Sequence, residues 1–424
     1  MGDNKRKPDI RFQGFTDDWE QRKFVSVFEG LQNNTLSRAD LNYENGTVKN
    51  VHYGDVLIKF GDYIDASETD LPYISDDAKA DKFKNSFLQD GDIIIADTAE
   101  DDTVGKCTEI QGSEGLKLSS GLHTIACRPK EKYGPMFLGY YINSPAYHNQ
   151  LKPLMQGIKV TSISKSALQD TDMIMPKSIE EQTMIGEYFA NLDSLITLQQ
   201  RKYDKLVNVK KSMLEKMFPR EGAKVPEIRF EGFTDDWEQR KLGDMVSFSK
   251  GSGYSKGDLK EDGTPIILYG RLYTKYETII SEVDTFVDEK KGSVFSKGGE
   301  VIVPASGETA EDISIASVVE KSGVLLGGDL NIITPPDEMD SAFLAISISN
   351  GKPHNDMAKM AQGKSVVHLH NTDLEKIDLP YPSHDEQRRI SGFFSDLDNL
   401  ITLQQRKLEK LKNIKKSMLE KMFV

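Results

Sequence analysis

The sequence contains a long internal repeat. Residues 9–23 return almost letter for letter at 227–241, which is 218 residues later. Two further stretches return unchanged 205 residues later: 195–202 at 400–407, and 210–218 at 415–423. The interiors between these ends differ, so the chain holds two copies of one architecture, with frames that do a shared job and interiors that do different ones. The period far exceeds the roughly 20–50 residues of a solenoid repeat.

The repeat divides the 424 residues into two halves. In each half a repeated leader comes first, a globular block follows, and a long helix closes the half. Pro219, Gly222 and Pro226 separate the halves, because proline and glycine end helices. The predicted boundaries are a leader at 1–23, a first block at 24–177, a central helix at 178–218, a linker at 219–226, a second leader and block at 227–382, and a C-terminal helix at 383–424.

Start signals and apolar spacing predict the two long helices. Ser178 with Glu181, and Ser383 with Glu386, have the spacing of a capping box after a proline turn. A helix of about forty residues, at about 1.5 Å per residue, spans roughly 60 Å. We expect the two helices to pair in antiparallel fashion as an intramolecular coiled coil. The alternative is that each helix lies on its own block.

The predicted coiled-coil seam follows the alternating steps of four and three residues that are typical of such helices. Lys210 and Lys415 fall on this seam, where a polar residue weakens packing but helps to fix the register. The apolar seam residues are Leu192, Ile196, Tyr203, Leu206, Met213, Leu397, Ile401, Leu408, Leu411 and Met418.

The two blocks are predicted to share one α+β fold. Short apolar runs predict strands at 56–58, 93–96, 265–268 and 301–303, and the runs at 137–142 and 343–348 fit helices. The blocks also align with each other: 135–157 matches 341–363 without gaps, and 37–41 matches 255–259. The expected architecture is therefore two similar α+β domains separated by two long antiparallel helices, with pseudo-two-fold symmetry.

Composition sets limits on the class of protein. The formal net charge of −13 counts against nucleic-acid binding unless positive charge is gathered locally, as it is at 199–220 and 404–424. No apolar stretch is long enough to span a membrane, so we expect a cytoplasmic protein. Cys107 and Cys127 fit a reducing compartment and are expected to be small buried hydrophobic residues.

Motifs that carry catalysis are missing from the sequence. The run 363–365 suggests a phosphate loop, but Ala358 stands where that loop needs a glycine. No cofactor-binding glycine turn, nucleophile elbow or zinc helix is present. The aligned His148 and His354 are expected to make scaffold hydrogen bonds rather than to act in catalysis. We therefore expect no catalytic residue, no metal site and no cofactor bound by this chain.

What remains is typical of recognition. The loops 156–165 and 362–370 open on glycine and are rich in short polar and basic donors, which suit phosphate oxygens and base edges. The stretch 271–276 interleaves basic and aromatic residues, as a DNA contact or an amphipathic edge strand would. The candidate DNA-binding residues are Arg38, Lys159, Thr161, Ser162, Lys165, Lys256, Arg271, Tyr273, Lys275, Lys364, His368 and His370.

The whole pattern resembles the specificity subunit of a type I restriction-modification system. The most specific pieces are two turn-to-helix signatures, in which a proline is followed by Glu-Gln and an isoleucine, and then by a Leu-Asp run. They occur at Pro176, Glu181, Gln182, Ile185 and 192–196, and again at Pro380, Glu386, Gln387, Ile390 and 397–401.

The resemblance implies two target-recognition domains, each reading one half of a bipartite double-stranded DNA site, with the helices setting the gap. It also implies docking of two methyltransferase subunits and, through them, of restriction and translocase subunits. Methyl transfer to adenine, with S-adenosylmethionine, ATP and Mg²⁺, would belong to those partners, so the chain alone is not an enzyme. The alternatives are a self-contained DNA methylase or nuclease with an unfamiliar site, and a protein-binding scaffold.

Overall fold

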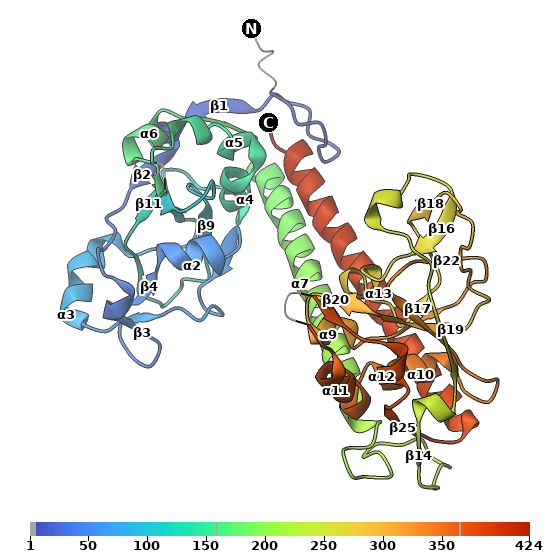
Figure 1. The fold of residues 1–424 in the computed structure, drawn as a ribbon. Coiled ribbons are helices and arrows are strands. Elements are labelled where there is room, and N and C mark those ends of the chain that lie inside the picture. Colours follow the sequence, from blue (N-terminus) through green and yellow to red (C-terminus); the bar gives the residue numbers. More distant parts are fainter. Residues whose placement is uncertain (1–5, 158, 364–365) are drawn as a thin grey trace. The chain divides into compact units, whose positions relative to one another are not determined.

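The chain folds into two compact units. The computed structural model describes residues 6–157, 159–363 and 366–424 (Figure 1). The first unit comprises Met1–Gln200 and Lys407–Val424, and the second comprises Arg201–Arg406. Each unit holds one block, the start of one long helix and the end of the other. The long helices are α7 (Ile179–Lys216) and α13 (His384–Lys421).

Each block is built on a five-stranded sheet with the same strand order. In both sheets the last pair is parallel and the other pairs are antiparallel. The first sheet runs β2 (Phe28–Gly30), β11 (Thr124–Pro129), β7 (Ile93–Ala96), β9 (Cys107–Gln111) and β5 (Tyr63–Asp65). The second runs β15 (Ser247–Lys250), β23 (Leu330–Thr334), β19 (Glu300–Pro304), β21 (Ser317–Val319) and β17 (Ile279–Ile280).

Smaller sheets complete each block. In the first block they are β10 (Leu118–Ser120), β4 (Lys49–Val51), β6 (Tyr73–Ile74) and β3 (Leu41–Asn42), with the pairs β1 (Glu20–Lys23)–β13 (Asp172–Met175) and β8 (Thr98–Ala99)–β12 (Thr161–Ser162). In the second they are β18 (Phe286–Val287), β16 (Thr264–Ile267) and β22 (Leu325–Leu326), with the pairs β14 (Glu238–Lys241)–β25 (Asp378–Tyr381) and β20 (Ser306–Gly307)–β24 (Val367–His368).

Short helices connect the strands. The first block has α1 (Phe24–Val27), α2 (Tyr53–Ile58), α3 (Asp77–Ala80), α4 (Phe137–Asn143), α5 (Pro145–His148) and α6 (Lys165–Gln169), with the 3₁₀ turns η1 (Arg38–Asp40), η2 (Asp81–Ser86) and η3 (Lys152–Leu154). The second has α8 (Arg271–Thr274), α9 (Ala310–Ile313), α10 (Ser341–Ile348), α11 (Gly351–Met360) and α12 (Asn371–Leu374), with η4 (Leu242–Asp244) and η5 (Lys256–Asp258).

The central strands β7 and β19 are apolar along most of their length because both of their faces are buried. All four residues of β7 are buried, because both faces of this strand are covered. Side chains alternate between the faces of a strand. Ile93 and Ile95 join one hydrophobic cluster, whereas Ile94 and Ala96 join another on the opposite face. In β19 the alternation recurs, with Val301 and Val303 in one cluster and Ile302 in the other.

One strand prediction and one strand alternative were wrong. Residues 56–58 lie in α2, where the His52 side chain accepts a hydrogen bond from Gly54 and starts the helix. A short apolar run cannot be told from a buried helix by periodicity alone. The edge-strand alternative for 271–276 also fails, because this stretch begins with α8.

The repeated leader is tied to the start of each long helix by an ion pair. The Arg11 guanidinium donates to both oxygens of Glu181, at 2.6 and 2.8 Å, and Arg229 donates to Glu386 at 2.6 and 2.7 Å. Each carboxylate side chain is only 1% exposed. The capping-box prediction is therefore wrong in part: Ser178 accepts from the Glu181 amide, but the carboxylate turns to the arginine.

The glutamine of each signature closes the same junction. The Gln182 side chain accepts from the Gly134 amide and donates to the Pro176 carbonyl. Gln387 makes the equivalent bonds, accepting from the Asp340 amide and donating to the carbonyl of Pro382. The Glu-Gln pair thus joins leader, block and helix in both units.

The two long helices pack together in antiparallel fashion, as expected, and the alternative of two separate helices is wrong. In the first unit the Lys415 ammonium lies 2.7 Å from Asp193, and in the second Lys210 lies 2.5 Å from Asp398. The start of each helix therefore meets the end of the other. These pairs are equivalent, since Lys415 and Asp398 lie 205 residues after Lys210 and Asp193. All ten predicted apolar seam residues are buried or half-buried.

An aromatic anchor follows the end of each helix. Phe423 packs within 6.5 Å, between ring centroids, of Trp19, Phe137, Tyr141 and Phe189. Phe218 packs in the same way against Trp237, Phe343 and Phe394, within 6.2 Å. The repeated Met-Phe ending therefore completes the core of the unit that holds it.

Candidate DNA interface

The predicted loop of the first unit is a tight hairpin. Gln156 and Ser162 exchange two backbone hydrogen bonds, and Thr161 and Ser162 pair with Ala99 and Thr98. Gly157 has φ +126°, and a side chain there would place its Cβ 1.9 Å from the Val160 carbonyl oxygen. The glycine is thus required by the turn. Lys159 is exposed in this loop.

The second unit repeats the hairpin with different side chains. Gln362 and His368 exchange the two backbone bonds, and a Cβ on Gly363 would lie 1.8 Å from the Val366 carbonyl oxygen. The rings of His368 and His370 stack, with centroids 6.4 Å apart. His370 also starts α12 in a capping box with Asp373. Lys364 lies outside the described residues.

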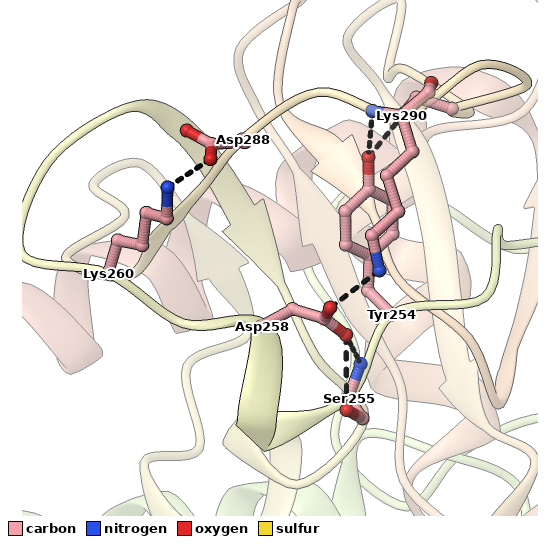
Figure 2. Close-up of polar contacts among 7 residues, drawn as sticks. Tyr254, Ser255, Asp258, Lys260, Asp288 and Lys290 are labelled. Carbon is pink, nitrogen blue, oxygen red and sulfur yellow. Dashed lines mark hydrogen bonds and ion pairs between the residues drawn. The ribbon is translucent and has the colours of Figure 1, made fainter.

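The matched stretches 37–41 and 255–259 form the same turn. In each, a serine and an aspartate three residues later make a capping box around a 3₁₀ turn. A lysine then bonds the aspartate: Lys79 with Asp40, and Lys290 with Asp258. Figure 2 shows the second turn, where Lys290 and Ser255 share the Asp258 carboxylate and hold its pKa down to about 2. Lys290 also lies over the Tyr254 ring, 4.6 Å from its centroid, and Lys260 pairs with Asp288 nearby.

These turns hold two of the predicted cations at the surface. Arg38 begins η1, and its half-exposed guanidinium makes two hydrogen bonds to Asp55, at 2.9 and 3.0 Å. Lys256 begins η5 and is exposed. A third cation, Lys165, begins α6 with its ammonium beside Gly30, where any Cβ would lie 2.0 Å from that nitrogen.

The stretch 271–275 is more structural than its composition suggests. The Arg271 side chain is only 9% exposed and bonds Asp284, Glu277 and the Glu282 carbonyl. Lys275 bonds the same Asp284, whose pKa falls to about 2 because of these hydrogen bonds. Tyr273 is half-buried beside Tyr269. The geometry therefore leaves Lys275 and Tyr273 nearer to solvent than Arg271.

A polar cluster in the first unit escaped the sequence analysis. The His123 ring lies 5.3 Å from the Tyr53 ring, and its Nδ1 lies 3.4 Å from Asp97 Oδ1. Asp97 accepts from the Thr98 hydroxyl, and its carbonyl accepts from the Ile163 amide. The cluster therefore adjoins the loop that holds Thr161 and Ser162. The residues are too far apart in sequence to form a recognisable motif.

The groups expected to be structural are so placed. His148 and His354 each bond a backbone carbonyl, of Asp102 and of Ser314. Cys107 and Cys127 are free and buried, and burial raises the pKa of the Cys127 thiol to about 12. In the part of the chain that the structure describes, no group of three or more His, Cys, Asp or Glu side chains could hold a metal ion, and no helix has the length and hydropathy to cross a membrane.

Comparison with known proteins settles the family. Residues 16–208 and 234–413 match the type I restriction modification DNA specificity domain. The chain belongs to this family. It is a specificity subunit, a non-catalytic component of a type I restriction-modification complex that binds DNA, and it holds two target-recognition domains. The enzyme and scaffold alternatives are therefore set aside.

Relatives and solved structures agree. A Methanocaldococcus jannaschii protein, provisionally named as the MjaX specificity subunit of a type I restriction enzyme, is 22% identical over 95% of this chain and 92% of its own length. The MjaVIII specificity subunit of the same organism is 21% identical over 63% of this chain and 65% of its own. The S subunit structure from M. genitalium has a TM-score of 0.56 at 13% identity and covers 99% of both chains. A chain from a structural study of the assembly and conformational transition of a type I restriction-modification system has a TM-score of 0.52 at 15% identity. The match covers 96% of this chain and 97% of that chain.

Proposed function

We propose that each target-recognition domain of this specificity subunit reads one half of a bipartite DNA site through its hairpin loop and the neighbouring turn. The observation that carries this proposal is one backbone frame holding unlike side chains. Thr161 and Ser162 in the first hairpin correspond to Val367 and His368 in the second. Short polar groups and imidazoles can bond base edges, and the adjoining cations suit phosphates. Different side chains on the same backbone would recognise different bases, so the two halves of the DNA site would differ in sequence.

The proposed set of DNA-contacting residues keeps the candidates predicted from the sequence except Arg271, and it includes Lys364, which lies outside the described residues, on its sequence alone. Buried, ion-paired Arg271 is retained as a support for its loop, because its guanidinium already bonds three acceptors. The proposed DNA-facing residues are Arg38, Lys159, Thr161, Ser162, Lys165, Lys256, Tyr273, Lys275, Lys364, His368 and His370.

The paired helices are proposed to act as a ruler between the half-sites. In each unit a lysine of one helix bonds an aspartate of the other, so sliding by a turn would separate both pairs. Because these ion pairs fix the register of the two helices, they also fix the length of the helical pair. Half-sites about one DNA turn apart lie roughly 34 Å from each other.

Exposed leucines on the helices are proposed to dock two methyltransferase subunits. Leu195 and Leu198 in the first unit, and their equivalents Leu400 and Leu403 in the second, are 46–50% exposed. Solvent-facing leucine pairs at repeated positions suit two copies of one partner. Restriction and translocase subunits would join through these partners, which would also hold S-adenosylmethionine, ATP and Mg²⁺. Partners can also neutralise phosphates, which offsets the −13 charge of this chain.

A block exchange tests the proposal. Residues 24–177 are replaced by the corresponding block of another specificity subunit, and the modified adenines are mapped in the genome of a host that also makes the methyltransferase. We expect one half of the methylated sequence to change and the other half to persist. The matched control exchanges residues 242–382, which should change only the second half. A change in both halves, or in neither, contradicts the assignment.

A further inference from the structure

Two equivalent residues adopt a backbone conformation that side chains rarely take. In the described part of the chain, the non-glycine residues with positive φ are His123 at +54°, Met136 at +64° and Asp329 at +57°. Met136 has a structural explanation, because it starts α4 and its amide donates to Glu109. His123 and Asp329 immediately precede β11 and β23, which occupy the same place in the two sheets. Non-glycine residues held in this region cluster at functional sites.

The hydrogen bonds around both residues are the same. The His123 carbonyl accepts from the Asp97 amide, whose own carbonyl accepts from Ile163 at the base of the hairpin loop. The Asp329 carbonyl accepts from Ala305, whose carbonyl accepts from Leu369. Each residue is therefore one strand away from the hairpin loop of its own domain. These shared backbone hydrogen bonds therefore hold the residue at the equivalent position in each domain.

The side chains themselves differ in chemistry. His123 is 47% exposed, with Nδ1 beside the Asp97 carboxylate and Tyr53 against its ring. Asp329 is exposed too, but Ala305 stands in the place of Asp97. A histidine can donate to guanine N7 or O6, whereas an ionised aspartate only accepts and suits a base amino group.

We infer that His123 and Asp329 are specificity-determining residues, one in each target-recognition domain, and that Asp329 accepts from an exocyclic amino group of cytosine or adenine. The inference rests on the proposed function and names the base-edge readers within it. The left-handed backbone presents each side chain beside the hairpin loop of its own domain, and the two positions are equivalent in the two folds. The unlike residues then account for unlike half-sites without any change of fold.

Glycine variants distinguish a loss of base recognition from a loss of stability. His123→Gly and Asp329→Gly keep the backbone, because glycine adopts positive φ without steric strain, so both variants should unfold within a few degrees of the unaltered chain. In complex with the methyltransferase, His123→Gly should lower discrimination at one base pair of the first half-site by about 10- to 100-fold, and Asp329→Gly at one base pair of the second. The measurement is the frequency of each base at every position of the methylated sites.

Matched controls are Glu114→Gly and Asp262→Gly, which remove exposed loop carboxylates elsewhere in the two domains. These should leave the methylated sequence unchanged. Asp329→His should shift the preferred base at that position away from an amino-bearing partner. An unchanged profile in the glycine variants, or a change in the wrong half-site, overturns the inference. The block exchange described above tests the proposed function separately, because it can succeed while these two positions prove silent.

Discussion

At the scale of single residues, the two domains differ in the carboxylate that accepts from the free amides at the start of an equivalent helix, α4 or α10. The Glu109 carboxylate accepts from the amides of Met136 and Gly139, at 2.6 and 2.9 Å, and so satisfies the start of α4. In the second domain Asp340 does this locally, by accepting from Phe343 at the start of α10. Glu109 comes instead from a central strand, and burial raises its pKa to about 7.

The raised pKa predicts a pH-dependent stability. The folded state binds this proton more tightly than the unfolded chain does, so the contribution is full below the unfolded pKa near 4.5 and is lost as pH rises through 7. The stability advantage of the unaltered chain over Glu109→Gln should fall by about 3 kcal/mol between pH 5 and pH 8. Urea unfolding in a Trp237→Phe background, where Trp19 fluorescence reports the first unit, measures it. Glu114→Gln should show no such change.

The candidate site was predictable from the sequence only where local chemistry defines it. Gly157 and Gly363 marked the hairpin loops, since each turn needs a residue without a side chain. The place of His123 depends on a left-handed backbone and on Asp97, which no spacing reveals. The ion pairs of Arg271 could not be predicted from the sequence, because its acidic partners are brought onto it only by folding.

At the scale of elements, continuous apolar runs were reliable where both faces of a strand are covered, as in β7 and β19. They failed at α2, where the run lies in a short helix that begins with a side-chain cap from His52. Heptad spacing was the strongest signal, because forty residues of it leave few other arrangements. Register was less predictable, because the partners of the seam lysines are aspartates beside the seam rather than on it.

The two seam lysines should differ in their effect on stability. Lys415 bonds both Asp193 and Asp62, whereas Lys210 bonds Asp398. Lys415→Met leaves two half-buried carboxylates without a cation, which should cost about 3 kcal/mol, and Lys210→Met should cost less. Each is measured by urea unfolding with the tryptophan of its own unit as the sole reporter. Equal losses would contradict the two-partner role, and exposed Lys412→Met serves as the control.

At the scale of the whole molecule, the ruler can be lengthened. Seven residues are inserted after Gln200 in α7 and seven after Arg406 in α13, where the two units divide. A heptad adds about 10 Å of helix, so the unspecified gap in the methylated site should grow by about three base pairs. Mapping of modified adenines gives the gap. Retained methylation with the original gap would reject the ruler, while an insertion in only one helix should abolish activity by breaking the register.

The division of the chain between the units also bears on the order in which they mature. Residues 201–406 form the second unit as one uninterrupted segment, whereas the first needs residues 407–424 to close around Trp19, Phe137 and Tyr141. The segment that completes the earlier-made domain is therefore synthesised some two hundred residues after the rest of that domain. The later-made domain can finish first. We therefore expect folding of the amino-terminal half to depend on the synthesis of residues 407–424.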